Sequence, residues 1–157
     1  MKVNYSDEKV IKGKKSLFLA GPTVRAEQED SWTGGKWRVQ AVQILKELGF
    51  DGVVYVPEYH TMKQFSDEQA QFDWEWEALH QCDIVVFWVD RRFPELPALC
   101  TNVEFGFYLA QKRIVYGRPD SANKNEYLDK LYTKVTSGQP FNDLRQTLKF
   151  CVEQLNK

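Results

Sequence analysis

Four short apolar runs, separated by segments with helical spacing, constrain the fold of this chain more than any other feature. The runs read KSLFLA, VVYV, DIVVFWV and RIVY, at residues 15–20, 53–56, 83–89 and 113–116. Short runs that are apolar almost throughout and alternate with helices are typical of a parallel sheet covered on both faces. The sequence therefore predicts an α/β protein with helices on both faces of the sheet.

The segments between the runs have the spacing of helices. Apolar residues recur at helical positions from Trp37 to Leu48, and Gly49 follows where a helix commonly ends. Further helices are predicted around Gln69–Gln81, from about Asn102 to Lys112 and at the C-terminus over Phe141–Leu155, whereas Tyr127–Val135 fits a helix, a strand or both. Because no repeat or Pro/Gly/Ser linker interrupts the chain, we expect residues 1–157 to form a single domain, with 1–14 as an N-terminal extension.

The charge balance excludes several classes of partner. Lys and Arg number 21 against 22 Asp and Glu, and neither half of the chain carries a long basic run, so the electrostatic signature of a nucleic-acid or membrane-surface binder is missing. No apolar stretch approaches the roughly 20 residues that span a bilayer, and the N-terminus lacks the apolar segment of a signal peptide. We expect a cytoplasmic protein with a small-molecule ligand and no nucleic-acid or membrane partner.

No metal or cofactor is predicted. The three cysteines include no CxxC pair, and His60 and His80 lack metal-ligand spacing to them. Neither GxGxxG nor GxxxxGK[ST] occurs, so nothing indicates dinucleotide binding or phosphoryl transfer. Ligands of open parallel sheets bind at the carboxyl ends of the strands, which makes the segments after each predicted strand the candidate site. Those segments are Gly21–Arg25, Pro57–His60, Asp90–Asn102 and Gly117–Asp120.

Glu104 is the first candidate catalytic carboxylate. It ends the sequence Thr101-Asn102-Val103-Glu104, which opens a predicted helix after the third predicted strand. The pattern fits a capping box, with Thr101 as N-cap and Glu104 as its partner. The same position fits a nucleophile, since the helix macrodipole favours an ionised carboxylate in the first turn. Both interpretations remain open on spacing alone.

Glu75 is the second candidate. In the segment QFDWEWEALHQ, Phe72, Trp76 and Leu79 define a predicted apolar face, and Glu75 falls beside it. Partial burial would raise the pKa of a carboxyl group there towards that of a general acid, whereas the alternative is a salt bridge at the rim of the core. Two carboxylates about 5 Å apart are what retaining cleavage of a glycosidic bond requires.

Some aromatic and basic residues near the predicted site are candidates for binding a substrate. Trp32 and Trp74 are less easily explained by packing than the other tryptophans, and a flat base could stack on either one. Arg91 and Arg92 could hold an anion, although adjacent arginines are more often solvated. The loop after the first run offers Gly21, Thr23 and Arg25, an incomplete set for binding a phosphate.

Four segments together resemble the nucleoside 2-deoxyribosyltransferase-like family. They are LFLAGPT at Leu17–Thr23, DWE at Asp73–Glu75, DIVVFWV at Asp83–Val89 and TNVEFG at Thr101–Gly106. The resemblance implies a flavodoxin-like (Rossmann-like) doubly wound parallel sheet of four to five strands. It also implies a two-step retaining transfer through a covalent 2-deoxyribosyl ester, and a homo-oligomer whose sites are completed by a neighbouring subunit.

The resemblance also assigns roles to individual residues. Glu104 matches the family's nucleophile, and Glu75 falls where the family places an acid that serves the nucleobase, although better-known members have Asp there. Gly21 and Pro22 resemble the loop that lines the site, and Asn102 is a candidate contact to the sugar. Further substrate-binding candidates are Asp73, Trp74 and Asp90, the last because Ala98 stands where better-studied members carry an aspartate that recognises the sugar.

Two other functions compete with nucleoside 2-deoxyribosyl transfer. The first is a 2-deoxynucleoside 5-monophosphate N-glycosidase, a hydrolase that shares the fold and the acid pair but needs a phosphate-binding loop. The second is a nucleotide-binding sensor without turnover, which loss of the acid pair would favour. Because the phosphate-binding set after the first run is incomplete, and because Glu75 and Glu104 are both present, we place the transferase before the hydrolase and the sensor.

Overall fold

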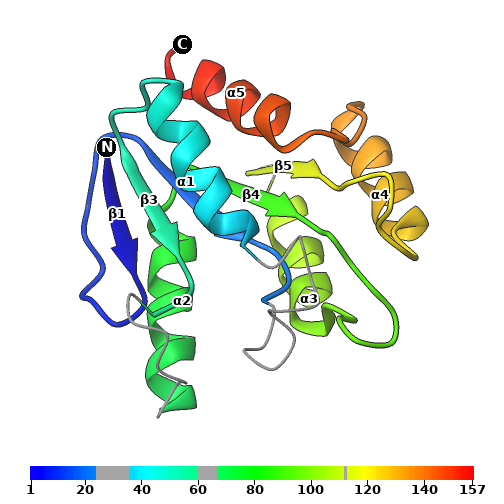
Figure 1. The fold of residues 1–157 in the computed structure, drawn as a ribbon, viewed down its shortest axis with the longest axis horizontal. Coiled ribbons are helices and arrows are strands. Elements are labelled where there is room, and N and C mark those ends of the chain that lie inside the picture. The colour runs from blue at the N-terminus through cyan, green and yellow to red at the C-terminus, as the bar shows by residue number, and fades with distance from the viewer. Residues whose placement is uncertain (24–35, 60–66, 112) are drawn as a thin grey trace.

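A five-stranded parallel sheet forms the centre of the molecule, with strands in the order β1-β3-β2-β4-β5 (Figure 1). The computed structural model describes residues 1–23, 36–59, 67–111 and 113–157. The strands are β1 (Lys2–Tyr5), β2 (Ser16–Ala20), β3 (Val53–Val56), β4 (Ile84–Trp88) and β5 (Ile114–Gly117). The helices are α1 (Trp37–Glu47), α2 (Glu68–Gln81), α3 (Leu99–Leu109), α4 (Glu126–Thr136) and α5 (Leu144–Leu155).

The chain reverses its direction of travel across the sheet at β2. This strand pairs with β3 on one side, where Phe18 lies opposite Tyr55, and with β4 on the other, where Ala20 lies opposite Phe87. In doubly wound sheets such a switch point opens a crevice at the carboxyl ends of the two strands, where ligands bind. The order β3-β2-β4-β5 is that of a flavodoxin-like sheet, and the α/β fold predicted from the sequence is confirmed.

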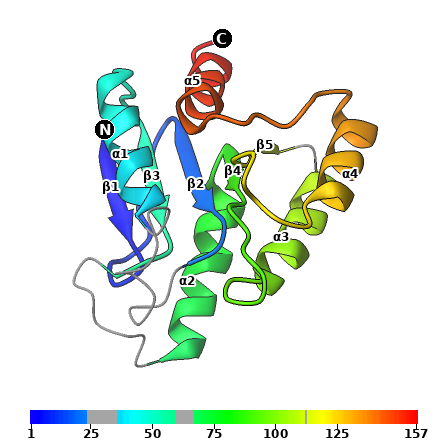
Figure 2. The same cartoon turned by 45° about the vertical axis from the view of Figure 1, so that its right-hand side comes forward.

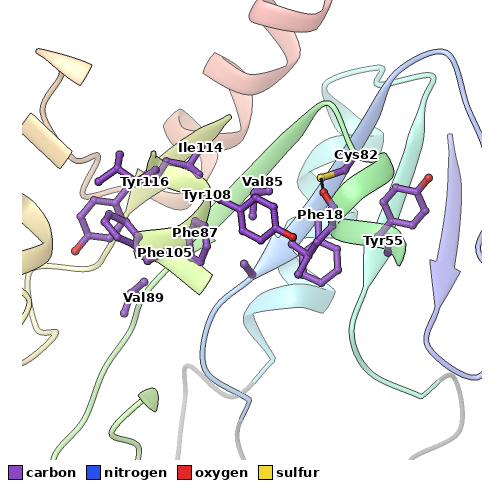
Figure 3. Close-up of a cluster of buried hydrophobic side chains, with 14 of the residues drawn as sticks. Phe18, Tyr55, Cys82, Val85, Phe87, Val89, Phe105, Tyr108, Ile114 and Tyr116 are labelled. Carbon is purple, nitrogen blue, oxygen red and sulfur yellow. Dashed lines mark hydrogen bonds between the residues drawn. The ribbon is translucent and has the colours of Figure 1, made fainter. Parts of the chain in front are cut away.

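Side chains that alternate along the central strands pack into two separate cores, one on each face of the sheet. Leu17 and Leu19 of β2 face α1 and α5, whereas Phe18 and Ala20 face α2, α3 and α4. Figure 2 shows α1 and α5 on one side of the sheet and the other three helices on the opposite side. The core between the sheet and the helices α2, α3 and α4 is rich in aromatic rings, and Figure 3 shows Phe87 and Phe105 within it. Their centroids lie 5.2 Å apart in an edge-to-face arrangement, which is the favoured geometry for such pairs.

Residues 1–14, expected as an extension before the first strand, contribute the edge strand β1. Lys2–Tyr5 pairs in parallel with Val53–Val56. Its sequence KVNY carries no continuous apolar run, so it takes its strand conformation from its partner β3 rather than from its own pattern. The segment left open over Tyr127–Val135 is helical and forms most of α4.

The apolar face predicted for α2 is wrong at Phe72 and Trp76, whereas Leu79 is buried as predicted. Phe72 and Trp76 are 57% and 51% exposed, while Trp74 and Ala78 face the sheet. The buried ring of Trp74 packs on Phe18, with centroids 6.2 Å apart. The helix carries two competing apolar stripes, and the stripe containing the small Ala78 allows it to approach the sheet closely.

Among the described residues, no helix is long and apolar enough to cross a membrane.

Candidate active site

A cavity of about 530 Å³ lies at the carboxyl edge of the sheet, over the switch point between β2 and β4. Its walls come from Phe18 and Ala20 of β2, residues 21–23 after it, Arg38 of α1, Pro57 after β3, and Glu75 of α2. Residues 95–100, from the loop before α3 and its first turn, close the other side together with Glu104. The segments after β2, β3 and β4 thus reach the cavity, together with residues of α1, α2 and α3.

Gly21 begins the loop that follows β2 and is required by the local geometry. Its φ of +152° is rare for other residues, and an added Cβ would lie 2.3 Å from the carbonyl oxygen of Trp88. The next residue, Pro22, accepts a hydrogen bond from the indole Nε1 of Trp37 at 3.2 Å. The loop therefore passes close over the end of β4, with its backbone on the cavity wall.

Arg38 holds the same loop from α1. Its buried guanidinium donates from Nη2 to the carbonyl oxygen of Gly21 at 2.7 Å and from Nη1 to Oγ1 of Thr23 at 3.1 Å. It also donates from Nε to the carbonyl oxygen of Leu19 and from Nη1 to Glu58, at 3.0 Å and 2.6 Å. Arg38 was not among the site residues predicted from the sequence. Its position in the first turn of the helix after β2, at the binding edge of the sheet, was the signal that could have found it.

Glu104 reaches the cavity from the second turn of α3. The helix begins at Leu99, and its N-cap is Ala98 in the left-handed conformation, with no side-chain hydrogen bond. The capping-box interpretation of Thr101 and Glu104 is therefore wrong, because Thr101 already lies inside the helix. The macrodipole also has less influence on Glu104 than expected, since its effect falls off beyond the first turn.

The pKa of Glu104 is raised to about 7, first by burial and then by the charge of Glu75, with Arg38 opposing both. This direction is opposite to the one expected from the helix macrodipole. Burial dominates because a half-buried carboxylate loses more solvation than nearby dipoles return.

Glu75 is half-buried on α2 and faces the same cavity. Burial raises its pKa, as expected from the sequence, while a hydrogen bond from Gln71 and the charge of Arg38 lower it. The structure thus brings the two candidate acids to one cavity from two helices. A third carboxylate, Glu95, lies on the cavity wall in the loop before α3, a segment that the sequence indicated as part of the site.

Comparison with known proteins identifies the family. A profile described as nucleoside 2-deoxyribosyltransferase like matches residues 14–122, which is more than half of the chain. The chain belongs to the nucleoside 2-deoxyribosyltransferase-like family. Among solved structures, the chain is similar to a 2-desoxiribosyltransferase from Leishmania mexicana, with a TM-score of 0.57 and 17% identity over 88% of this chain and 97% of that one. No curated protein matches the sequence.

Four of the residues that the family resemblance assigned to the site line its cavity, namely Gly21, Pro22, Glu75 and Glu104. The other four lie elsewhere. Asp73 is exposed on α2 and accepts a hydrogen bond from Gln69 at 2.8 Å. Trp74 is buried in the core of this deoxyribosyltransferase-like fold, so packing accounts for it after all.

Asp90 and Asn102 belong to polar contacts beside the cavity. Asp90 is buried and accepts a hydrogen bond from Nε of Arg92 at 3.0 Å. The amide oxygen of Asn102 accepts a hydrogen bond from Nη2 of Arg91, and Nη1 of Arg91 donates to the carbonyl oxygen of Lys124 at 2.8 Å. Arg91 is buried rather than solvated, and it ties the start of α3 to the segment before α4. Neither Asp90 nor Asn102 is on the cavity wall.

Two further candidates, Trp32 and Arg25, lie outside the described residues. Within the described ranges, no group of three or more His, Cys, Asp or Glu side chains could hold a metal ion.

Proposed function

We propose that the chain is a nucleoside 2-deoxyribosyltransferase, which moves 2-deoxyribose between nucleobases with retention of configuration. The observation that carries the proposal is the pair of carboxyl groups, Glu75 and Glu104, on the wall of one cavity at the switch point of the sheet. Retaining cleavage needs one carboxylate to attack the sugar and one carboxylic acid to protonate the leaving base. Membership of the family supports the same reaction class.

In the first step, a carboxylate oxygen of Glu104 attacks C1′ of the deoxyribose. The bond between C1′ and the base nitrogen breaks, and its electron pair leaves with the base. Glu75 donates a proton to the departing base and becomes ionised. The products of this half-reaction are a free base and a glycosyl ester on Glu104.

In the second step, a nitrogen of the acceptor base attacks C1′ of the ester from the face that the first base left. The bond between C1′ and Glu104 breaks, which restores the carboxylate, and Glu75 accepts the proton that the acceptor base loses. Two inversions at C1′ give net retention. No external proton, metal or redox partner is needed for the balance.

The charges of the site support one shared proton. The charge of Glu75 raises the pKa of Glu104, so ionisation of both acids at once is unfavourable near neutral pH. The permanent charge of Arg38 lowers the pKa of each acid, so protonation of both is disfavoured as well. The reaction needs one carboxylate and one carboxylic acid, with the proton on Glu75. Because the larger rise in pKa falls on Glu104, the proton must pass from Glu104 to Glu75 once the substrate is bound.

The alternative is hydrolysis of a 2-deoxynucleoside 5-monophosphate, in which water replaces the acceptor base. Arg38 and Thr23 are the features of the cavity wall that could favour a phosphate. The guanidinium of Arg38 is already paired with Glu58, however, at 2.6 Å, which is why we place the transferase first. A binding protein without turnover has no use for two buried acids, which are costly to keep.

Chromatography of deoxyadenosine incubated with the protein, with and without free cytosine, tests the proposal. A transferase forms deoxycytidine and adenine only when cytosine is present. Free deoxyribose in both reactions indicates the hydrolase, for which deoxyadenosine monophosphate is then the better substrate. If deoxyadenosine is unchanged with and without cytosine, and deoxyadenosine monophosphate is also unchanged, both enzymatic functions are refuted.

We also propose that the enzyme is a homo-oligomer in which a neighbouring subunit completes each site, as the family resemblance implies. Phe72, Trp76 and Phe107 support it, since they expose aromatic rings on α2 and α3, the helices that carry the two acids. Sedimentation of the wild-type protein measures its mass in solution. A monomer at micromolar concentration, with full activity, would refute this part.

A further inference from the structure

Arg38 carries a buried charge, and it takes part in neither of the two chemical steps of the proposed transfer. Its side chain is only 3% exposed, and a guanidinium remains charged at any pH that the protein meets. Burying such a group is unfavourable unless it is paired, and a buried ion pair contributes little net stability compared with apolar residues of the same volume. Stability alone therefore does not explain why this position carries a charge.

The contacts of Arg38 converge on the first loop of the site. Four of its five N–H groups donate to acceptors, and two of these acceptors are the Gly21 carbonyl oxygen and Thr23 Oγ1, both from the cavity wall. The planar guanidinium can satisfy acceptors in several directions at once, which an ammonium at the end of a flexible chain does not do. The loop is thus fixed to α1 by the residue that also lines the cavity.

The charge of Arg38 reaches both acids. It lowers the pKa of Glu75 and of Glu104, against the effect of burial in each case. Glu58, its ion-pair partner, is not on the cavity wall, whereas the two acids and Arg38 are.

We propose that Arg38 is a positioning residue for the acid pair, which fixes the Gly21–Thr23 loop and supplies the permanent positive charge that keeps one of the two carboxyl groups ionised. This inference rests on the proposed function, because it assigns Arg38 to the same site. The residue makes no bond to the reacting atoms; it sets the shape and the charge state of the groups that do.

The first test is the pH profile of kcat/KM for R38M, measured with a substrate whose leaving group needs no proton from Glu75. Removing the positive charge raises the pKa of Glu104, so the acid limb moves to higher pH by about one unit, as opposite charges near a carboxylate shift it by about 1–3 units. With a pKa of about 7 in the wild type, this shift leaves about fivefold less ionised Glu104 at pH 7. A purely structural role would lower the amount of folded protein and leave the limb in place, and that result would overturn the inference.

A second variant, R38K, separates charge from geometry. The lysine keeps the positive charge, so the acid limb stays where it is in the wild type. It cannot hold Leu19, Gly21 and Thr23 together, so kcat/KM falls by about tenfold or more, since even about 1 Å of misplacement in a site costs about 10²-fold. Wild-type kcat/KM in R38K would remove the loop-fixing part of the proposal.

R118M is the matched control. Arg118 also pairs with a carboxylate, Asp129, at 2.7 Å and is partly buried, but it does not line the cavity. Its loss should lower thermal stability without moving the acid limb, and an equal shift in R118M would overturn the assignment to Arg38. If R38M does not fold, the double variant R38M/E58Q removes both members of the ion pair and leaves no unpaired buried charge, so it measures the same shift.

A titration without substrate separates this inference from the proposed function. Carbon NMR follows the Glu104 carboxyl group, whose signal is assigned by its loss in E104Q. A higher pKa of Glu104 in R38M supports the inference even if no deoxyribosyl chemistry is found, in which case the proposed function alone fails. An unchanged pKa of Glu104 overturns the inference whatever the activity.

Discussion

Glu75 on α2 and Glu104 on α3 line one cavity, and the charge of Glu75 raises the pKa of Glu104. The two helices lie on the same face of the sheet and are separated in sequence by β4. Coupling between the acids is therefore a product of the fold and not of their spacing along the chain. This coupling predicts a measurable pH dependence of kcat/KM.

We predict that, with a substrate whose leaving group needs no proton, kcat/KM rises with pH through about 7, because Glu104 must lose its proton before it attacks the sugar and its pKa is about 7. In E75Q the neighbouring charge is gone, so the pKa of Glu104 falls and the acid limb moves to lower pH. The profile should be measured with a substrate whose leaving group needs no proton, since E75Q lacks the acid. A limb that stays in place in E75Q would mean that the two carboxyl groups do not interact.

The two acids should respond differently to the leaving group. General acid assistance is typically worth about 10²–10⁴-fold, so E75Q loses about that much rate with an ordinary nucleoside and recovers most of it with an activated leaving group. E104Q recovers none. Mass spectrometry of quenched E75Q, given the activated substrate and no acceptor, should show a deoxyribosyl group on the peptide that contains Glu104. Equal losses with both substrates and no adduct would return Glu75 to a salt-bridging role.

Glu104 should cost the protein stability at alkaline pH. Its pKa in the folded state, about 7, lies above the ordinary value of 4.5, so the folded state gains a proton more readily than the unfolded chain. Its contribution to stability is present below about pH 4.5 and is lost as pH rises through 7. E104Q removes this loss and should be more stable than the wild type at pH 8 by about 2 kcal/mol, or about 4–8 °C in Tm.

The difference in Tm between E104Q and the wild type should shrink towards zero near pH 4, where the wild-type carboxyl group is protonated too. E153Q, which changes an exposed glutamate, is the control and should alter Tm little at either pH. An E104Q protein that is less stable than the wild type at pH 8 would contradict the burial of this carboxylate.

Gly21 and Gly106 offer a matched pair of alanine substitutions. G21A places a Cβ 2.3 Å from the Trp88 carbonyl oxygen, so the loop or the end of β4 must move, with a loss of about 2 kcal/mol of stability and a clear fall in kcat/KM. G106A meets nothing within 4 Å inside α3, and it should add about 0.5–1 kcal/mol while leaving activity unchanged. Chemical denaturation measures both; equal stability of G21A and the wild type would show that the loop is not held as tightly as described.

The sequence was sufficient to predict the strands that are buried on both faces, because their apolar runs are continuous. The sequence singled out Glu75 and Glu104 as candidates, but it was the family resemblance and not their spacing that placed them in one site; both line the cavity. The sequence did not predict β1, whose strand conformation depends on its partner β3. The rotation of α2 was also missed, because Phe72–Trp76 and Trp74–Ala78 are both plausible stripes and only contact with the sheet decides between them.

The start of α3 explains most of the remaining differences at the site. Its N-cap is an alanine in the left-handed conformation, for which no residue pattern gives a signal. The pattern of Thr101 and Glu104 therefore suggested a helix start that the chain does not use. Asn102 was assigned because it lies close to Glu104 in sequence, and Asp90 because Ala98 replaces the aspartate of better-studied family members. Arginine side chains bind both of them.

The left-handed conformation of Ala98 makes position 98 of the cavity wall a favourable site for directed evolution. Ala98 lines the cavity and has a φ of 54°, a conformation in which asparagine and aspartate are several-fold enriched. New polar groups in a binding site are usually acquired at the expense of folding stability. At position 98 the backbone conformation itself favours asparagine and aspartate. Selection for a different substrate and selection for higher folding stability should therefore favour the same substitutions.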